Sequence, residues 1–122
     1  MCIRDSNYGY VVNSDFQQVS LQNRAGNFVT ANAETSSSGL SQIVLDDELR
    51  GSDPNPAGVN SYPIVSLTWI LAHPEHPKND AMKEVFTYML SDEAQSKSDA
   101  LGYVPLPESI RVQARAAVDT LK

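Results

Sequence analysis

The sequence has little cysteine and no long apolar run. Its 122 residues include one cysteine, Cys2, so no disulfide can form within the chain, and the redox compartment stays open. No stretch approaches the roughly 18 consecutive apolar residues of a membrane-spanning helix. The first residues also do not have the charged region and apolar region of a signal peptide. Taken alone, these absences indicate a cytoplasmic protein, an inference that holds only if the chain is not a fragment.

Basic charge is also scarce. Nine Lys and Arg stand against fifteen Asp and Glu, which gives a net charge of −6 and a pI near 4.7. A nucleic-acid-binding protein would show a basic stripe, so this class is disfavoured. An anionic ligand is not excluded, because backbone N–H groups can hold an anion without help from net charge. With 41% apolar residues, the chain can bury a small core, as one domain or a piece of one.

One apolar stretch dominates the sequence: SYPIVSLTWIL, at 61–71. Near-continuous apolar character is typical of a strand that is covered on both faces. Pro63 is tolerated at its start, where ladder pairing has not begun. We therefore predict a buried strand here, with Trp69 in the core.

The chain before this strand is polar and rich in loops. A short apolar patch at 8–12 contains Gly9, which suggests a close backbone approach or a bend. Two short strands are expected within 17–30, around a turn at 23–26. Asn32 could cap a helix, although the serines that follow are weak helix formers. A short helical turn near 46–49 is possible, and 51–60 is expected to be a loop.

The chain after the strand is expected to be helical. A first helix should be capped by Asn79 or Asp80, and a second should start at Ser91 and stop at Gly102. Pro107 is well placed at the first position of a last helix. The first helix has an apolar stripe of Met82, Val85, Phe86, Met89 and Leu90, and the last helix has one of Ile110, Ala114, Ala117, Val118 and Leu121.

One cluster has the residue types of a metal site. His73, Glu75 and His76 could supply two imidazoles and a carboxylate to zinc. Pro74 and Pro77 place them in a loop, however, and the sequence shows no further ligand. We favour a solvated loop and predict no metal site.

Other candidates for chemistry have simpler explanations. Ser66 and Thr68 could face a cleft, but hydrogen bonds to neighbouring backbone are favoured. An acidic run could provide paired carboxylates for acid–base work, although a solvated face is favoured. Ser91 and Ser109 are interpreted as helix caps. No nucleophile elbow, phosphate loop or Cys–His pair occurs, so we predict no catalytic residue and no cofactor. The acidic run is Asp46, Asp47 and Glu48.

Several motifs together resemble one family. SYPIVSLTWIL, followed by an acidic helix and LGYVPLPESI, resembles the C-terminal end of the phosphate-binding proteins of ABC transporters. YGYV and LQNRAGNFV are similar to two further markers, and LRGSDPNPAGVNSYPI is similar to the cyanobacterial or marine branch. The resemblance covers the chain from about Gly9 to Lys122.

The resemblance implies an α/β fold: a C-terminal fragment of the two-lobed, type II periplasmic-binding-protein fold. Residues 7–60 would be a remnant of the second lobe with a linker. Residues 61–122 would supply the crossing strand and the C-terminal helices of the first lobe. The segment VNSDFQQVS is shorter than its counterpart in the family, so one helix would be lost.

The resemblance also implies a function. The intact protein would be a monomeric, periplasmic, non-enzymatic receptor that binds inorganic phosphate and delivers it to an ABC transporter permease, its one link to the membrane. In this family, phosphate is held by Ser and Thr hydroxyls, backbone N–H groups, an Arg and an Asp that lie upstream of the GYV motif. We therefore expect no phosphate ligand in this chain, because those motifs would precede Gly9.

The opening MCIRDS, residues 1–6, resembles translated adapter sequence, so we expect it, Cys2 included, to be non-native. The chain would then be the end of a longer gene, and a signal peptide would lie upstream. Three alternatives stay open: a receptor for another oxyanion, a small hydrolase-like α/β enzyme using Asp46 or His73 and His76, and a stand-alone helical interaction module at 61–122.

Overall fold

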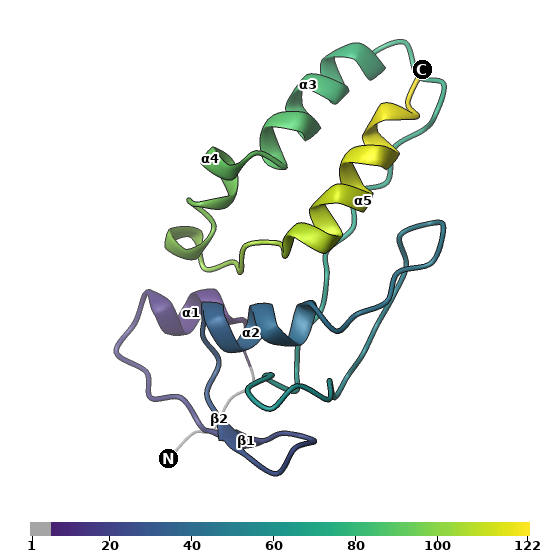
Figure 1. Cartoon of the computed structure of the whole chain (residues 1–122). Coiled ribbons are helices and arrows are strands. Elements are labelled where there is room, and N and C mark those ends of the chain that lie inside the picture. Colours follow the sequence, from purple (N-terminus) through teal and green to yellow (C-terminus); the bar gives the residue numbers. More distant parts are fainter. Residues whose placement is uncertain (1–5) are drawn as a thin grey trace.

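The computed structural model describes residues 6–122 and places their elements in two groups (Figure 1). A long connection, residues 41–78, contains no helix or strand and runs from one group to the other. The regular secondary structure of the described residues is mostly helical, and their one sheet has two strands. The first group comprises α1 (Tyr8–Val12), β1 (Leu21–Gln22), β2 (Phe28–Val29) and α2 (Ala33–Leu40); the second comprises α3 (Asn79–Met89), α4 (Asp92–Gln95), the 3-10 helix η1 (Asp99–Leu101) and α5 (Glu108–Asp119).

The predicted hairpin is confirmed. β1 and β2 pair antiparallel, with Leu21 opposite Val29. The turn is closed by the Gly26 N–H, which donates to the Asn23 carbonyl at 2.9 Å. Gly26 has φ of +87°, a left-handed conformation that glycine adopts without steric cost. Local turn chemistry therefore favours this element.

The ambiguous serine-rich segment forms helix α2. Asn32 and Thr35 make a capping box, in which each side chain accepts from the backbone N–H of the other. This cap offsets the weak helix propensity of the serines, and the helix buries Gly39 and Leu40. The segment 46–49, where a short helical turn was expected, forms a hydrogen-bonded turn and no helix. The Leu49 N–H donates to the Asp46 carbonyl in this turn.

The first and last predicted helices of the C-terminal half are present, with small shifts at their ends. The single helix predicted from Ser91 to Gly102 is wrong, because a turn at 96–98 divides it into α4 and η1. Asn79 is the first residue of α3 and not its cap, because Lys78 holds that position. Ser91 caps α4 as predicted, accepting from the Ala94 N–H. Gly102 stops η1 with φ of +78°. Pro107 precedes α5 as its N-cap residue and is not the first helical residue.

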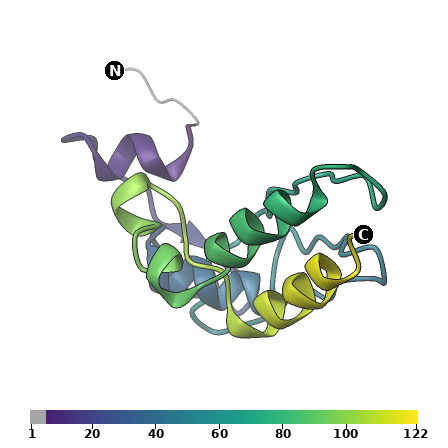
Figure 2. The ribbon, with the colours of Figure 1, turned by 90° about the horizontal axis from the view of Figure 1, so that it is seen from above.

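The prediction of a close backbone approach at Gly9 is confirmed. The patch at 8–12 forms the short helix α1, which lies against the end of η1 (Figure 2). A Cβ atom added to Gly102 would lie 2.3 Å from the Gly9 Cα atom. Any side chain at Gly102 would therefore push α1 away from η1.

The predicted buried strand is wrong for this chain. Residues 61–71 belong to the long connection and form no strand. Ile64 is 72% exposed and Leu71 94% exposed. Trp69 is 44% exposed, so its placement in the core is also wrong. The physical reason is that the segment has no neighbouring strand to pair with, because the sheet of the described residues consists of the hairpin alone.

The core is correspondingly small. On α5, Ile110 is buried as predicted, and Leu121 just beyond the helix is buried too. On α3 only part of the expected stripe is covered, since Val85 and Met89 are 55% and 43% exposed. Apolar surface is left open on both groups of elements. The buried apolar residues are Val29, Leu40, Ile43, Leu90, Ile110 and Leu121.

Candidate functional site

The most unusual surface of the molecule is residues 64–71, called the apolar segment below. Its side chains alternate in burial over residues 64–68. Val65 and Leu67 are half-buried, whereas Ile64 and Ile70 are 72% and 59% exposed. Val65 lies against α2, where its two methyl groups would lie 3.1 and 3.3 Å from a Cβ added to Gly39. Alternation with a period of two is the geometry of a strand, and it holds for residues 64–68, which have one face on the molecule and one face in solvent. Trp69, Ile70 and Leu71 are all exposed.

The backbone of the apolar segment is unpaired within the described residues. No backbone hydrogen bond of the part that the structure describes involves an N–H group of residues 64–71. One local contact is made by Ser66, whose hydroxyl donates to the Leu67 carbonyl at 3.3 Å. Unpaired N–H and C=O groups along an extended apolar stretch form a template for another strand. The segment can therefore accept a partner by strand addition.

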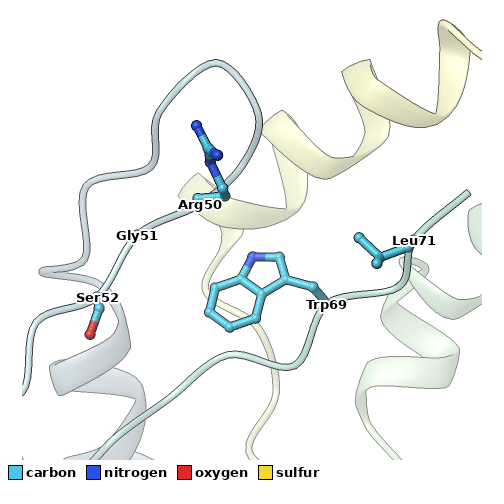
Figure 3. A pocket seen from close by; sticks show the side chains of 5 residues that line it. All are labelled: Arg50, Gly51, Ser52, Trp69 and Leu71. Atoms are coloured by element: carbon cyan, nitrogen blue, oxygen red, sulfur yellow. The ribbon is translucent and has the colours of Figure 1, made fainter.

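Trp69 ties the segment to the loop before it. Its indole N–H donates to the Leu49 carbonyl at 2.7 Å. The ring forms one wall of an open depression of about 610 Å³, opposite the loop at 50–52 (Figure 3). Leu71 lies at the other end of this wall. The lining is apolar, so the depression suits an apolar side chain better than an ion.

The start of the segment is fixed by Asn23, which sequence reasoning treated only as a turn residue. Its side-chain amide donates to the carbonyls of Val59 at 2.8 Å and Ser61 at 3.2 Å. Its side-chain oxygen accepts from the Asn27 N–H. The Ser61 hydroxyl is 3.0 Å from that of Ser38 on α2. The hairpin and α2 thus hold the chain where the apolar segment begins.

The end of the segment is fixed by Asn79. The sequence indicated this residue only as a possible helix cap. Its buried amide donates to the carbonyls of His73 at 3.2 Å, Pro74 at 2.9 Å and Lys122 at 2.7 Å. The Lys122 N–H also donates to the Pro74 carbonyl. Nothing in the sequence pattern signals the contact with Lys122, because it joins residues 43 positions apart.

The structure does not assemble His73, Glu75 and His76 into a ligand set. His73 Nδ1 accepts from the Glu75 N–H, and His76 Nδ1 accepts from the Lys78 N–H, each at 3.2 Å. All three residues are exposed in the loop before α3. Within residues 6–122, no group of three His, Cys, Asp or Glu side chains is placed to hold a metal ion.

The acidic run, Asp46 to Glu48, forms a solvated face, as the sequence predicted, and two of its carboxylates pair with Arg50. Asp46 accepts from the backbone N–H groups of Arg50 and Glu48 and makes an ion pair with the Arg50 side chain at 3.0 Å. The Arg50 backbone N–H, more than any other group, lowers the pKa of Asp46 below its usual range. Glu48 makes a second ion pair with Arg50 at 3.0 Å.

The hydrolase alternative requires Asp46 and the two histidines to converge in one pocket. The depression beside Trp69 has none of them in its lining. A second depression, at the start of α3, is lined by His76 without Asp46. The described residues therefore give that alternative no support.

The serine predictions divide. Ser66 bonds to neighbouring backbone as favoured, and Ser91 is a cap. Ser109 is not a cap, because it lies inside α5, where its carbonyl accepts from Gln113. Thr68 is exposed on the apolar segment.

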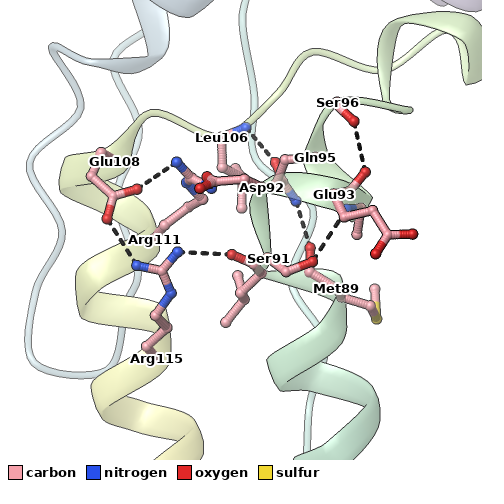
Figure 4. Close-up of polar contacts among 12 residues, drawn as sticks. Met89, Ser91, Asp92, Glu93, Gln95, Ser96, Leu106, Glu108, Arg111 and Arg115 are labelled. Carbon is pink, nitrogen blue, oxygen red and sulfur yellow. Dashed lines mark hydrogen bonds and ion pairs between the residues drawn. The ribbon is translucent and has the colours of Figure 1, made fainter.

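A set of charged side chains fastens α5 to α4 (Figure 4). Arg111 pairs with Asp92 at 2.6 Å and also with Glu108. Arg115 pairs with Glu108 at 2.8 Å and donates to the Leu90 carbonyl at 2.9 Å. The hydrogen bond from Arg111 is the main cause that lowers the pKa of Asp92. These arginines are committed to carboxylates of their own chain, which leaves them poorly suited to a free anion.

Comparison with known proteins gives two relevant relatives. No protein-family model matches the chain. The phosphate-binding protein PstS of Pasteurella multocida is 31% identical over 123 residues, which is 88% of this chain and 33% of that protein. The phosphate-binding protein PstS of Methanocaldococcus jannaschii is 28% identical over 134 residues, or 93% of this chain and 33% of that protein.

This chain is a distant homologue of phosphate-binding proteins. It spans about a third of the length of the relatives it matches. Both relatives are named for binding phosphate, and neither name describes an enzyme. No helix of residues 6–122 has the length and apolar character needed to cross a membrane. Within the homologous region, the apolar segment is the most prominent surface without a partner.

Proposed function

We propose that this chain is the C-terminal part of a phosphate-binding solute receptor that delivers phosphate to an ABC transporter permease. The observation that carries the proposal is the pair of matches, each of which covers most of this chain and only a third of a phosphate-binding protein. The intact receptor would be periplasmic, monomeric and without a cofactor. The fragment would contribute scaffold to it and no enzymatic activity.

The apolar segment supports this proposal from an independent direction. Eight consecutive residues with unpaired backbone and exposed Ile and Leu side chains are costly in water, since an exposed Leu or Ile forgoes about 1.5–3 kcal/mol of burial free energy. A longer protein would recover this free energy by placing strands beside the segment. In the proposed receptor, residues 61–71 are the strand that crosses between lobes, residues 7–60 belong to the second lobe and 61–122 to the first.

The phosphate ligands would lie outside this chain. Arg50, Arg111 and Arg115 are paired with carboxylates of their own chain. The net charge of −6 adds a general repulsion for phosphate. We therefore expect the hydroxyls, N–H groups, Arg and Asp that hold phosphate to come from residues preceding Gly9.

Calorimetric titration with inorganic phosphate tests the proposal. The 122-residue chain should show no binding, whereas residues 7–122 joined to their native upstream sequence should bind. A micromolar dissociation constant for the 122-residue chain, about −8 kcal/mol, would overturn the placement of the ligands. A folded, joined protein that ignores phosphate but binds sulfate or another oxyanion would replace phosphate with that ligand.

A further inference from the structure

We propose that the chain as it stands pairs with a second copy of itself through the apolar segment, in an antiparallel two-stranded ribbon centred on Leu67. This inference concerns the 122-residue chain alone and does not rest on the proposed function. It depends on three features of residues 64–71: an unpaired backbone, an absence of charge and a self-complementary order of side chains.

The backbone provides the first argument. Within the described residues, the N–H groups of residues 64–71 find no backbone acceptor. Two such segments placed antiparallel would satisfy one another's N–H and C=O groups along their facing edges. The segment is held at both ends, by Asn23 near its start and Asn79 just after it, so little chain entropy is lost when it pairs.

Charge provides the second argument. No charged residue occurs between Asp53 and Glu75, with His73 counted as neutral. Two copies carrying −6 each repel one another overall, but this region is the long neutral stretch where they can approach. Natural proteins protect open strand edges with charges or prolines, and this segment has Pro63 at one end and no such protection further along.

The order of side chains provides the third argument and fixes the register. When Leu67 lies opposite Leu67 of the second copy, Ser66 faces Thr68, and Val65 faces Trp69. Ile64 then faces Ile70. Polar residues meet polar residues, and a β-branched residue meets an aromatic one, which are favourable cross-strand pairs. A shift of the second strand by two residues places Ser66 opposite Ile70 in one direction and Ile64 opposite Thr68 in the other, so the centred register is preferred.

The exposed face makes the pairing accessible. Ile64, Ser66, Thr68 and Ile70 are exposed, whereas Val65 and Leu67 rest on their own molecule. The two copies can therefore meet without unfolding either one. Because each strand contributes seven residues, 64–70, the interface is short, and we expect a reversible, concentration-dependent equilibrium between monomer and dimer.

The experiment measures molar mass by light scattering and sedimentation over a range of chain concentrations. We expect the mass to rise from 13.3 kDa towards twice that value. The double variant S66K/T68K puts four lysines in the ribbon, which face each other in two cross-strand pairs. It should weaken association at least about tenfold. The matched variant S66K/T68E carries the same number of new charges but places opposite charges face to face, and should restore the dimer.

Each other result contradicts the proposal. A chain that stays monomeric at every concentration rules out the pairing. A dimer that persists in S66K/T68K shows that another surface of the chain associates. Larger aggregates that form equally in both variants would show the same. A monomeric S66K/T68E variant refutes the centred register, since a register with Thr68 opposite Thr68 would place its two glutamates together. Far-ultraviolet circular dichroism checks that both variants keep the helices.

Discussion

Asn23 shows how one side chain can hold distant parts of this molecule together. It is 5% exposed and links the hairpin turn to the carbonyls of Val59 and Ser61, more than thirty residues away. The sequence identified Asn23 as a turn residue because asparagine is common in turns. Its long-range bonds were not predictable, since they depend on where the loop at 57–61 comes to lie.

Replacement of Asn23 tests this role. Asn23→Ala should lower the free energy of unfolding by about 2–3 kcal/mol, because it removes two hydrogen bonds to carbonyls and leaves the Asn27 N–H without its acceptor. Urea unfolding followed by circular dichroism measures the change. The control is Asn27→Ala, which removes one exposed bond to Val59 and should cost less than about 1 kcal/mol. Equal losses in both variants would contradict the assignment.

Trp69 offers a second measurement at the scale of a residue. It is the one tryptophan of the chain and is 44% exposed, so iodide should quench its fluorescence readily in the chain alone. In the proposed receptor the same ring would be covered, and quenching should fall severalfold with a shift of emission to shorter wavelength. Identical quenching in the chain and in the joined protein would mean that the apolar segment gains no cover. The variant Trp69→Phe, which has no tryptophan, gives the background fluorescence for both proteins.

At the scale of elements, the features that form from local sequence were predictable. The conformation of residues 61–71 was not, because it depends on whether a neighbouring strand is present. The hairpin, the Ser91 cap and the stop at Gly102 depend on neighbours within a few residues. The buried strand at 61–71 was predicted from apolar character, which reports what a segment prefers and not whether another strand is present to pair with it. For His73 and His76 the sequence favoured a solvated loop, and both side chains are exposed in the loop before α3.

The fastening of α5 to α4 predicts a dependence on pH. The folded state lowers the pKa of Asp92 through Arg111, from an ordinary value of 3.8. A lowered pKa means that the contribution to stability is fully present above the unfolded value and is lost as the pH falls through the folded value. Asp92→Asn should therefore destabilise the chain at neutral pH and make little difference in strong acid.

Urea unfolding midpoints of both proteins at neutral pH and below the usual Asp range measure this difference. Because the Asp92 side chain is largely exposed, the effect should be small and should shrink in high salt. Asp47→Asn, in the acidic run outside this set, provides a matched control of the same chemistry. A gap between Asp92→Asn and the unmodified chain that stays constant with pH would argue that the ion pair contributes nothing.

At the scale of the whole molecule, the proposed function places the phosphate ligands in residues that precede this chain. Homology to two phosphate-binding proteins covers a third of their length, and the candidate chemical groups of residues 6–122 are either paired or dispersed. The resemblance read from SYPI and GYVPLP agrees with these relatives. The prediction about residues 1–6 lies almost wholly outside the described residues, so the structure does not test it.

The most direct test is the sequence of the native coding region upstream of residue 7. The proposed function predicts a reading frame that continues upstream into a Ser-, Thr- and Gly-rich anion-binding loop with an Arg and an Asp, preceded by a signal peptide. The codons for MCIRDS should then be absent from the genome. If instead Met1 is a genomic start codon and MCIRDS is encoded in place, the chain is not the end of a phosphate receptor and the proposal fails.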